Sequence, residues 1–306
     1  MQRTKFALMM LMACGAATTT ALAYGGHHHG GYTGGFGSGT DTGGGAVSGT
    51  GDVVDDTQMP ESIDLTGVVR DFKTSHPDFE TFPGMDFEAW NGSDDVYPNL
   101  VKDELDEDGK PVFNDALLET RSWSDIPIES EQTFNQWFRD VPGVNTSWLH
   151  TITLERQEDG SYFFAQEKPN YFFIADGLGY GNSEGPLRWA EPYSHNFHFT
   201  YELEMEFTYT DPATRDNALE FTFTGDDDVW VFINGHLACD IGGVHPQASR
   251  SVNLDEHVAE YGLEVNQNYP LKLFFCERHT SESNFRIETT LTLRKSELPP
   301  TAGLFD

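Results

Sequence analysis

Hydrophobic and polar residues alternate along several stretches of this chain. The longest such stretch is 197–209, where apolar residues occupy every odd position and polar residues every even position. A period of two over this length predicts a β-strand with one buried face. The same alternation returns at 219–224 and 285–293, and the mostly apolar run 271–276 predicts a more completely buried strand.

Helical patterns are few and short. The stretch 130–139 places Phe134, Trp137 and Phe138 on one face, which predicts one helix, and 255–261 predicts a shorter second one. Turn sequences such as Asn234-Gly235 separate the strand patterns. The expected fold class is therefore all-β, an antiparallel β-sandwich or barrel with small helical insertions.

The beginning of the chain has the pattern of a secretory signal peptide at residues 1–23. A basic start precedes an apolar stretch at 6–13, and a small-residue cleavage site ends at Ala23. An alternative is a bacterial lipobox at 11–14, which would leave Cys14 as a lipidated N-terminus. In both cases we expect a secreted or cell-surface protein.

The composition of the chain changes twice after residue 23. Residues 24–61 are rich in Gly, Ser, Thr and Asp, which predicts a flexible linker, and the histidines at 27–29 are interpreted as part of this spacer. Hydrophobic alternation occupies 62–296 and predicts one folded domain. Residues 297–306 are expected to form a short tail.

Composition narrows the classes of partner. The 306 residues include 50 acidic and 18 basic ones, for a net charge of −32, which excludes a nucleic-acid partner because phosphate binding needs basic surface. Removal of the signal peptide leaves two cysteines, Cys239 and Cys276. In an oxidising compartment these two could form a disulfide, or they could be two buried free thiols, and the sequence leaves both open.

Three consecutive aspartates, Asp226, Asp227 and Asp228, directly precede the uncharged run 229–233. Two like charges 4 Å apart repel by about 1 kcal/mol in water and by about 4 kcal/mol at an effective dielectric constant of 20. A calcium ion would offset this repulsion, since Ca²⁺ takes oxygen ligands from carboxylates, carbonyls and water. The alternative is a solvated acidic turn that ends a strand.

Three motifs resemble one known family. The stretch FTFTGDDDVWVFINGHLACDIGGVH at 221–245 resembles the signature of the fibro-slime domain, a branch of the PA14 superfamily. The stretch LTGVVRDFKTSHPDFE at 65–80 resembles the opening of that domain, and FFCERHTSESNFRIET at 274–289 resembles its closing motif. The resemblance implies a PA14-like β-sandwich or barrel.

The resemblance also implies a metal site. Flocculin-type PA14 lectins hold Ca²⁺ with two adjacent aspartates, and the ion then binds sugar hydroxyls. The matching positions are Asp226 and Asp227, with a cis peptide expected in the aspartate run, while Asp228 falls where many relatives have Gly or Ser. Which two of the three aspartates chelate the ion therefore stays open.

Further candidates for ligand contact are His245 after the core hairpin, Asn284, and the loop aromatics Tyr180 and Trp189, whose rings could stack on sugars. Three acidic groups receive structural interpretations. Glu277 is expected to pair with Arg278 or Arg286, the acids at 103–108 are expected to form a hairpin turn, and Glu202, Glu204 and Glu206 are expected to form a solvated strand face.

These observations favour an exported, non-catalytic carbohydrate-binding or adhesion module, dependent on calcium, whose partner is extracellular polysaccharide or glycan. One alternative is a structural protein of a matrix or cell surface that contacts other proteins. A polysaccharide hydrolase is a further alternative, although the sequence offers no separated pair of carboxylates for such catalysis.

Overall fold

The computed structural model describes residues 59–80, 96–168, 170–182, 195–280 and 282–295. The predicted signal peptide, nearly all of the predicted linker, the predicted tail and Trp189 lie outside these residues. The strands are β1 (Ser62–Phe72), β2 (Asn145–Arg156), β3 (Tyr162–Gln166), β4 (Phe199–Tyr209), β5 (Glu220–Gly225), β6 (Asp228–Ile233), β7 (His236–Ile241), β8 (Ala248–Asn253), β9 (Gln267–Glu277), β10 (Phe285–Thr289) and β11 (Arg294–Lys295).

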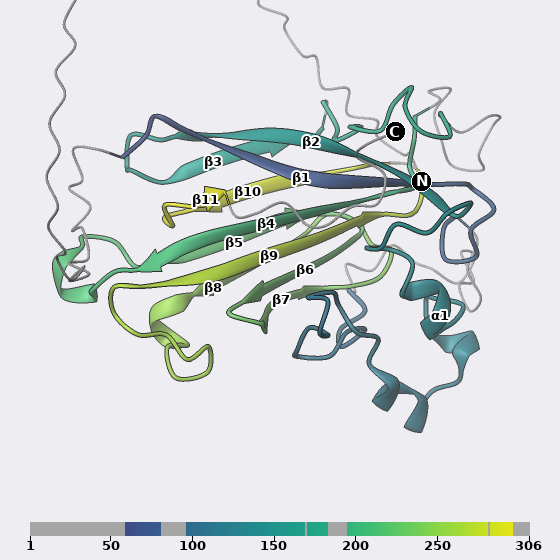
Figure 1. The fold of residues 1–306 in the computed structure, drawn as a ribbon, viewed down its shortest axis with the longest axis horizontal. Helices are drawn as coiled ribbons and strands as arrows, with labels where there is room; N and C mark the ends of the chain where they lie inside the picture. Colours follow the sequence, from purple (N-terminus) through teal and green to yellow (C-terminus); the bar gives the residue numbers. More distant parts are fainter. Residues whose placement is uncertain (1–58, 81–95, 169, 183–194, 281, 296–306) are drawn as a thin grey trace, which may run out of the picture. The chain divides into compact units, whose positions relative to one another are not determined.

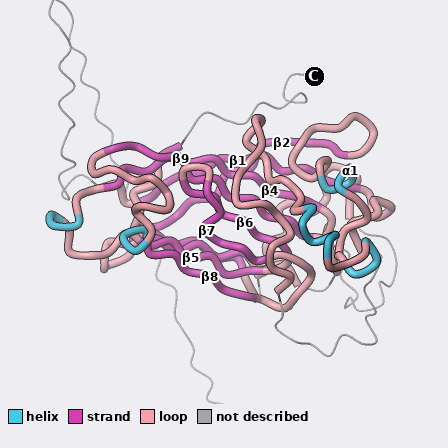
Figure 2. The backbone as a smooth tube through the Cα atoms, turned by 90° about the horizontal axis from the view of Figure 1, so that it is seen from below, coloured by secondary structure: helices cyan, strands magenta, loops and turns pink. Residues whose placement is uncertain are grey.

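The strands form one antiparallel sheet. Its order is β7-β6-β9-β4-β1-β2-β3-β10-β5-β8, and β11 pairs with β4. The sheet curls until its two edge strands, β7 and β8, approach each other without forming a ladder, as the view in Figure 1 and the view from below in Figure 2 show. This nearly closed, barrel-like sheet confirms the predicted all-β fold.

Two hydrophobic cores lie on opposite sides of the sheet. The interior core takes the inward residues of the curled sheet, including Val229, Val231 and Ile233 of β6. The outer core packs Trp230 and Phe232 against residues of the segment 97–140, here called the cover segment. Because β6 is buried on both faces, its sequence is apolar without alternation.

The cover segment contains little regular helix. The predicted helix at 130–139 is limited to α1 (Glu131–Phe134), which follows the capping residue Ser130. The helix ends at Phe134 because Trp137 packs in the outer core. There its indole N–H donates to Asp78 over 2.9 Å. The predicted helix at 255–261 is a 3₁₀ turn, Leu254–Glu256, and no helix of the described residues is long and apolar enough to cross a membrane.

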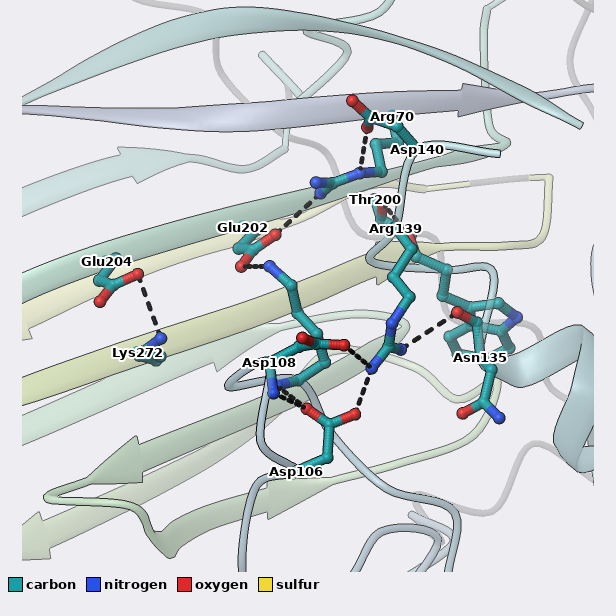
Figure 3. Close-up of polar contacts among 12 residues, drawn as sticks. Arg70, Asp106, Asp108, Asn135, Arg139, Asp140, Thr200, Glu202, Glu204 and Lys272 are labelled. Atoms are coloured by element: carbon teal, nitrogen blue, oxygen red, sulfur yellow. Dashed lines mark hydrogen bonds and ion pairs between the residues drawn. The ribbon is translucent and has the colours of Figure 1, made fainter. Parts of the chain in front are cut away.

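The polar face of β4 is covered at Glu202 and becomes exposed toward Glu206, which corrects the sequence interpretation at Glu202. Glu202 is fully buried, where it accepts a hydrogen bond from Nη1 of Arg70 over 2.8 Å and pairs with Nζ of Lys110. Arg70 also binds Asp140 through Nε over 2.9 Å (Figure 3). Lys110 and Asp140 belong to the cover segment, so this network fastens the cover to the sheet.

The acids at 103–108 confirm the turn interpretation. The carboxylate of Asp106 accepts the backbone N–H groups of Asp108 and Lys110, over 3.0 Å and 2.9 Å, and the Asp106 backbone N–H donates to the Lys110 carbonyl. The Asp106 carboxylate also pairs with Arg139 (Figure 3). This turn presents Lys110 to Glu202.

The two cysteines are free buried thiols, so the disulfide alternative is not the one this fold adopts. Cys239 on β7 lies opposite Val231 and packs in the interior core, whereas Cys276 on β9 lies opposite Asp228 and packs in the outer core. Their side chains point to opposite faces of the sheet. A disulfide needs Cβ atoms about 4 Å apart, which this arrangement does not allow.

Candidate functional site

The aspartate run forms the corner between β5 and β6. β5 ends at Gly225, the peptide between Asp226 and Asp227 is cis, and β6 begins at Asp228. Gly225 is required here, because a Cβ atom at this position would lie 2.3 Å from the carbonyl oxygen of Asn284. The corner is therefore pressed against the loop that precedes β10.

Asp226 is held by one residue of that loop. Its Oδ1 accepts the backbone N–H of Asn284 over 2.7 Å, and its Oδ2 accepts the side-chain amide of Asn284 over 2.6 Å. The side chain is only 4% exposed, and burial raises the pKa of Asp226 to about 7 despite these two donors. Asn284 thus belongs to the site, as a donor to Asp226.

Asp227 is held by the backbone at the end of β9. Its Oδ2 accepts the backbone N–H groups of Arg278 and His279, over 3.0 Å and 3.1 Å. Burial, followed by repulsion from Asp226, raises the pKa of Asp227 well above its usual value. Neither Asp226 nor Asp227 forms an ion pair within the described residues.

Asp228 is engaged differently from its two neighbours. Its carboxylate binds the guanidinium of Arg278 through two hydrogen bonds, Nε to Oδ2 over 2.5 Å and Nη2 to Oδ1 over 3.1 Å. Its Oδ1 also accepts the backbone N–H of Gly243 over 2.6 Å. Asp228 is therefore already paired with a buried cation, unlike Asp226 and Asp227, and metal binding by any of the three stays a prediction.

The sequence alone did not identify the role of Glu277. It is fully buried, and neither of its carboxylate oxygens has a well-formed hydrogen bond within the described part of the chain, although the Ser283 hydroxyl and the His279 backbone N–H are near enough to favour its ionised form. Burial and then repulsion from Asp227 and Asp226 raise its pKa well above the usual value. The predicted ion pair is wrong, because Arg278 binds Asp228 and Arg286 binds Glu288.

Strand parity explains which acids meet the arginine. Along β6, Asp228 has the parity of Trp230 and faces the outer core, and along β9, Arg278 has the parity of Cys276 and faces the same side. Asp227 and Glu277 have the opposite parity. Arg278 therefore pairs with Asp228 on the outer face and leaves Asp227 and Glu277 without a cation.

Two other predicted ligand residues lie in defined places. His245 is 4% exposed, its Nδ1 lies 2.7 Å from the carbonyl oxygen of Pro246, and burial lowers its pKa. Tyr180 is 41% exposed on a loop that Asp71 anchors by accepting the Tyr180 backbone N–H, and Lys73 lies over its ring. A ligand contact at either residue stays a prediction.

A pocket of about 480 Å³ lies beside the corner and was not identified from the sequence. It is formed by the end of β3, the loop 170–176 and His195, and its walls include Tyr171 and Phe173. The aromatic residues of this loop come from the sequence NYFFIAD, which carries no pattern that distinguishes a pocket wall from a core segment.

Comparison with known proteins gives this arrangement a context. Residues 212–300 match the family profile of the PA14 domain. Protein psiD of Dictyostelium discoideum is 38% identical over 233 residues, which are 76% of this chain and 42% of that protein. Protein psiR of the same organism is 42% identical over 214 residues, 68% of this chain and 20% of that protein. The chain thus spans less than half the length of either relative.

Among solved structures, an anti-sigma factor domain-containing protein is similar over 38% of this chain and 37% of that chain, with 14% identity. Its TM-score of 0.23 is too low to carry an argument. The fold and the corner themselves define an antiparallel barrel-like module with a buried pair of adjacent carboxylates. The chain belongs to the PA14 superfamily.

Proposed function

We propose that this chain is an exported, non-catalytic carbohydrate-binding or adhesion module, in which Asp226 and Asp227 hold a calcium ion that contacts an extracellular glycan. Membership of the PA14 superfamily supports the broad class, a carbohydrate-binding or adhesion module. The secretory pattern of residues 1–23 supports export.

The charge balance at the corner carries the proposal of a cation. Asp226, Asp227, Asp228 and Glu277 are all buried, and the buried guanidinium that faces them, Arg278, binds Asp228. If all four acids were ionised, three negative charges would remain uncompensated in a poorly solvated site. Such a site either takes up protons or binds a cation.

The available oxygens fit calcium. Each oxygen of Asp226 accepts one hydrogen bond, Oδ1 of Asp227 accepts none within the described residues, and a carboxylate has about four lone-pair positions in all. The described residues hold no cluster of three or more His, Cys, Asp and Glu side chains arranged around one metal position. Calcium suits a two-acid site because it completes its shell with carbonyl, water and hydroxyl oxygens.

When bound, the ion would supply a positively charged centre that takes neutral hydroxyl ligands. The residues of the chain hold the carboxylates of Asp226 and Asp227 in position. Asn284 fixes the carboxylate of Asp226, and the backbone N–H groups of Arg278 and His279 fix that of Asp227. The corner is thus preorganised, which lowers the entropic cost of assembling a metal site.

A glycan array probed with the folded chain, in millimolar CaCl₂ and in EDTA, tests this function. We expect binding to a subset of neutral glycans in calcium and its loss in EDTA and in the Asp226→Asn, Asp227→Asn double variant. Asp216→Asn, an exposed aspartate outside the corner, is the matched control and should bind like the unmodified chain. Calcium-dependent self-association without glycan binding would instead support the matrix alternative.

A further inference from the structure

The pocket beside the corner is an open recess lined by aromatic rings and polar side chains. Its volume of about 480 Å³ lies within the range of small-molecule sites in proteins. Phe173 and His195 stack with ring centroids 3.8 Å apart and planes 11° apart, and Tyr171 is tilted against Phe173 at 5.7 Å. The recess therefore has walls made of fixed rings.

Polar groups fix the orientation of these rings. Oδ2 of Asp176 lies 2.6 Å from Nδ1 of His195, and Oδ1 of the same carboxylate accepts the backbone N–H of Asn196 over 2.8 Å. This bridge holds the imidazole flat against Phe173. Asn170 and Gln166 add exposed side-chain amides at the pocket. Rings with nearby amides suit a ligand that has both apolar C–H faces and hydroxyl groups, as a pyranose does.

The pocket wall is joined to the calcium corner by hydrogen bonds. The backbone N–H of Phe172 donates to the carbonyl of Ser283 over 2.8 Å, and the Ser283 hydroxyl donates to the carbonyl of Phe172 over 3.0 Å. The Lys168 backbone N–H donates to Oδ1 of Asn284 over 3.2 Å, and Asn284 in turn holds Asp226. Pocket and corner thus share the loop 282–284.

Tyr171 gives a second sign that the two sites are close. The carboxylates of Glu282 and Asp226 are near enough to its phenol to disfavour a phenolate. Together with burial, which acts most strongly, these acids raise the pKa of Tyr171 to about 12. The phenol therefore stays a neutral hydroxyl that can donate and accept hydrogen bonds.

The charges around the pocket select among sugars. The acids near it are Asp176 on its wall and Glu282 behind Tyr171, and the exposed Nζ of Lys168 lies 3.7 Å from Glu282, so the set is net negative. A uronic acid or another anionic sugar would be repelled by this set, whereas a neutral hexose would not. His150, whose pKa burial lowers, adds no permanent positive charge.

We infer that this pocket is a second subsite, which takes a neutral hexose unit next to the unit bound at the Asp226–Asp227 corner. The inference rests on the proposed function and specifies its ligand as an oligosaccharide of at least two neutral sugars. The first unit depends on calcium. The second unit depends on the rings of Tyr171, Phe173 and His195.

Calorimetric titration in millimolar CaCl₂ compares single sugars with matched disaccharides. The probes are the methyl α-glycosides of mannose, glucose and galactose, followed by mannobiose, maltose and lactose, with a hyaluronan tetrasaccharide as the anionic probe. We expect a neutral disaccharide to bind about tenfold more tightly than its monosaccharide, and Tyr171→Ala and His195→Ala each to remove most of that gain. Monosaccharide binding and the calcium response should not change.

His257→Ala is the matched control, because His257 is also a partly exposed imidazole paired with a carboxylate, that of Glu260, over 2.8 Å. It should keep the disaccharide gain. Monosaccharide binding without any gain for disaccharides, or tighter binding of the hyaluronan probe, would overturn the subsite and leave the proposed function standing. If no sugar binds in calcium, both the function and the subsite are overturned.

Discussion

Asp228 and Arg278 form a fully buried, two-point ion pair on the outer face of β6 and β9, with Nε 2.5 Å from Oδ2. The same guanidinium donates through Nη1 to the carbonyl of Pro127 over 2.5 Å and lies over the ring of Trp137. One side chain therefore links the aspartate corner to the cover segment. It also leaves Asp226 and Asp227 as the two aspartates of the run that form no ion pair within the described residues.

Replacement of this arginine should destabilise the fold strongly. Arg278→Gln leaves Asp228 buried without its cation, and losing one partner of a buried pair costs about 3–5 kcal/mol. Urea denaturation measures the loss. Arg286→Gln is the control, since its pairs with Glu288 and Glu167 are partly exposed and should be worth less than about 1 kcal/mol.

If Arg278→Gln does not fold, Asp228→Asn gives the second measurement. This change keeps the shape of the side chain and one acceptor oxygen, and we expect a smaller loss than for the arginine variant. Equal stability of the Arg278 and Arg286 variants would contradict the structural role of the pair.

Replacement of Glu202, the buried glutamate of β4 that binds the cover segment, should also destabilise the fold. Glu202→Gln leaves Arg70 and Lys110 without their shared carboxylate, and we expect a loss of about 3 kcal/mol in urea denaturation. Glu206→Gln is the control on the same strand face, where the side chain is exposed, and should cost less than about 0.5 kcal/mol. If the two variants lose the same amount, Glu202 is as solvated as Glu206, which would contradict its buried network.

The raised pKa of Asp226 predicts a pH dependence for the metal-free chain. The folded state binds a proton up to about pH 7, whereas the unfolded state releases it near pH 4, so between these values the folded state binds more protons. The stabilising contribution of Asp226 is therefore present at low pH. It is lost as the pH rises from about 4 to about 7, at up to about 1.4 kcal/mol per pH unit.

Urea denaturation in EDTA at pH 5 and pH 8 tests this dependence. Buried histidines such as His76 and His245, whose pKa values burial lowers, act in the opposite sense, so the comparison is between the unmodified chain and Asp226→Asn. The variant should be less destabilised between pH 5 and pH 8 than the unmodified chain. An identical pH dependence in both would show that Asp226 is already ionised at low pH.

Much of the sheet could be predicted from the sequence because strand periodicity is a local property. The alternation at 197–209 corresponds to β4, and the runs at 219–224 and 271–276 correspond to β5 and the inner part of β9. The helix at 130–139 was predicted too long, because a local pattern does not contain the tertiary demand that draws Trp137 into the outer core.

The site was only partly predictable. Adjacent acids before an apolar strand indicated the corner, and the family resemblance indicated which pair to favour. The partner of Asp228 is Arg278, fifty residues away, so strand register decides the pairing and the sequence does not contain it locally. Glu277 was misassigned for the same reason, since its neighbour Arg278 points to the opposite face.

Calcium titration into EDTA-stripped protein at pH 7.5, followed by calorimetry, tests the central proposal most directly. The unmodified chain should bind one Ca²⁺, and a hundredfold excess over Kd should stabilise it by about 2.7 kcal/mol, which raises Tm by about 5–10 °C. The Asp226→Asn, Asp227→Asn double variant should show neither effect, whereas Asp216→Asn should keep both. Calcium binding of equal affinity in the double variant would contradict the assignment of the ion to this corner.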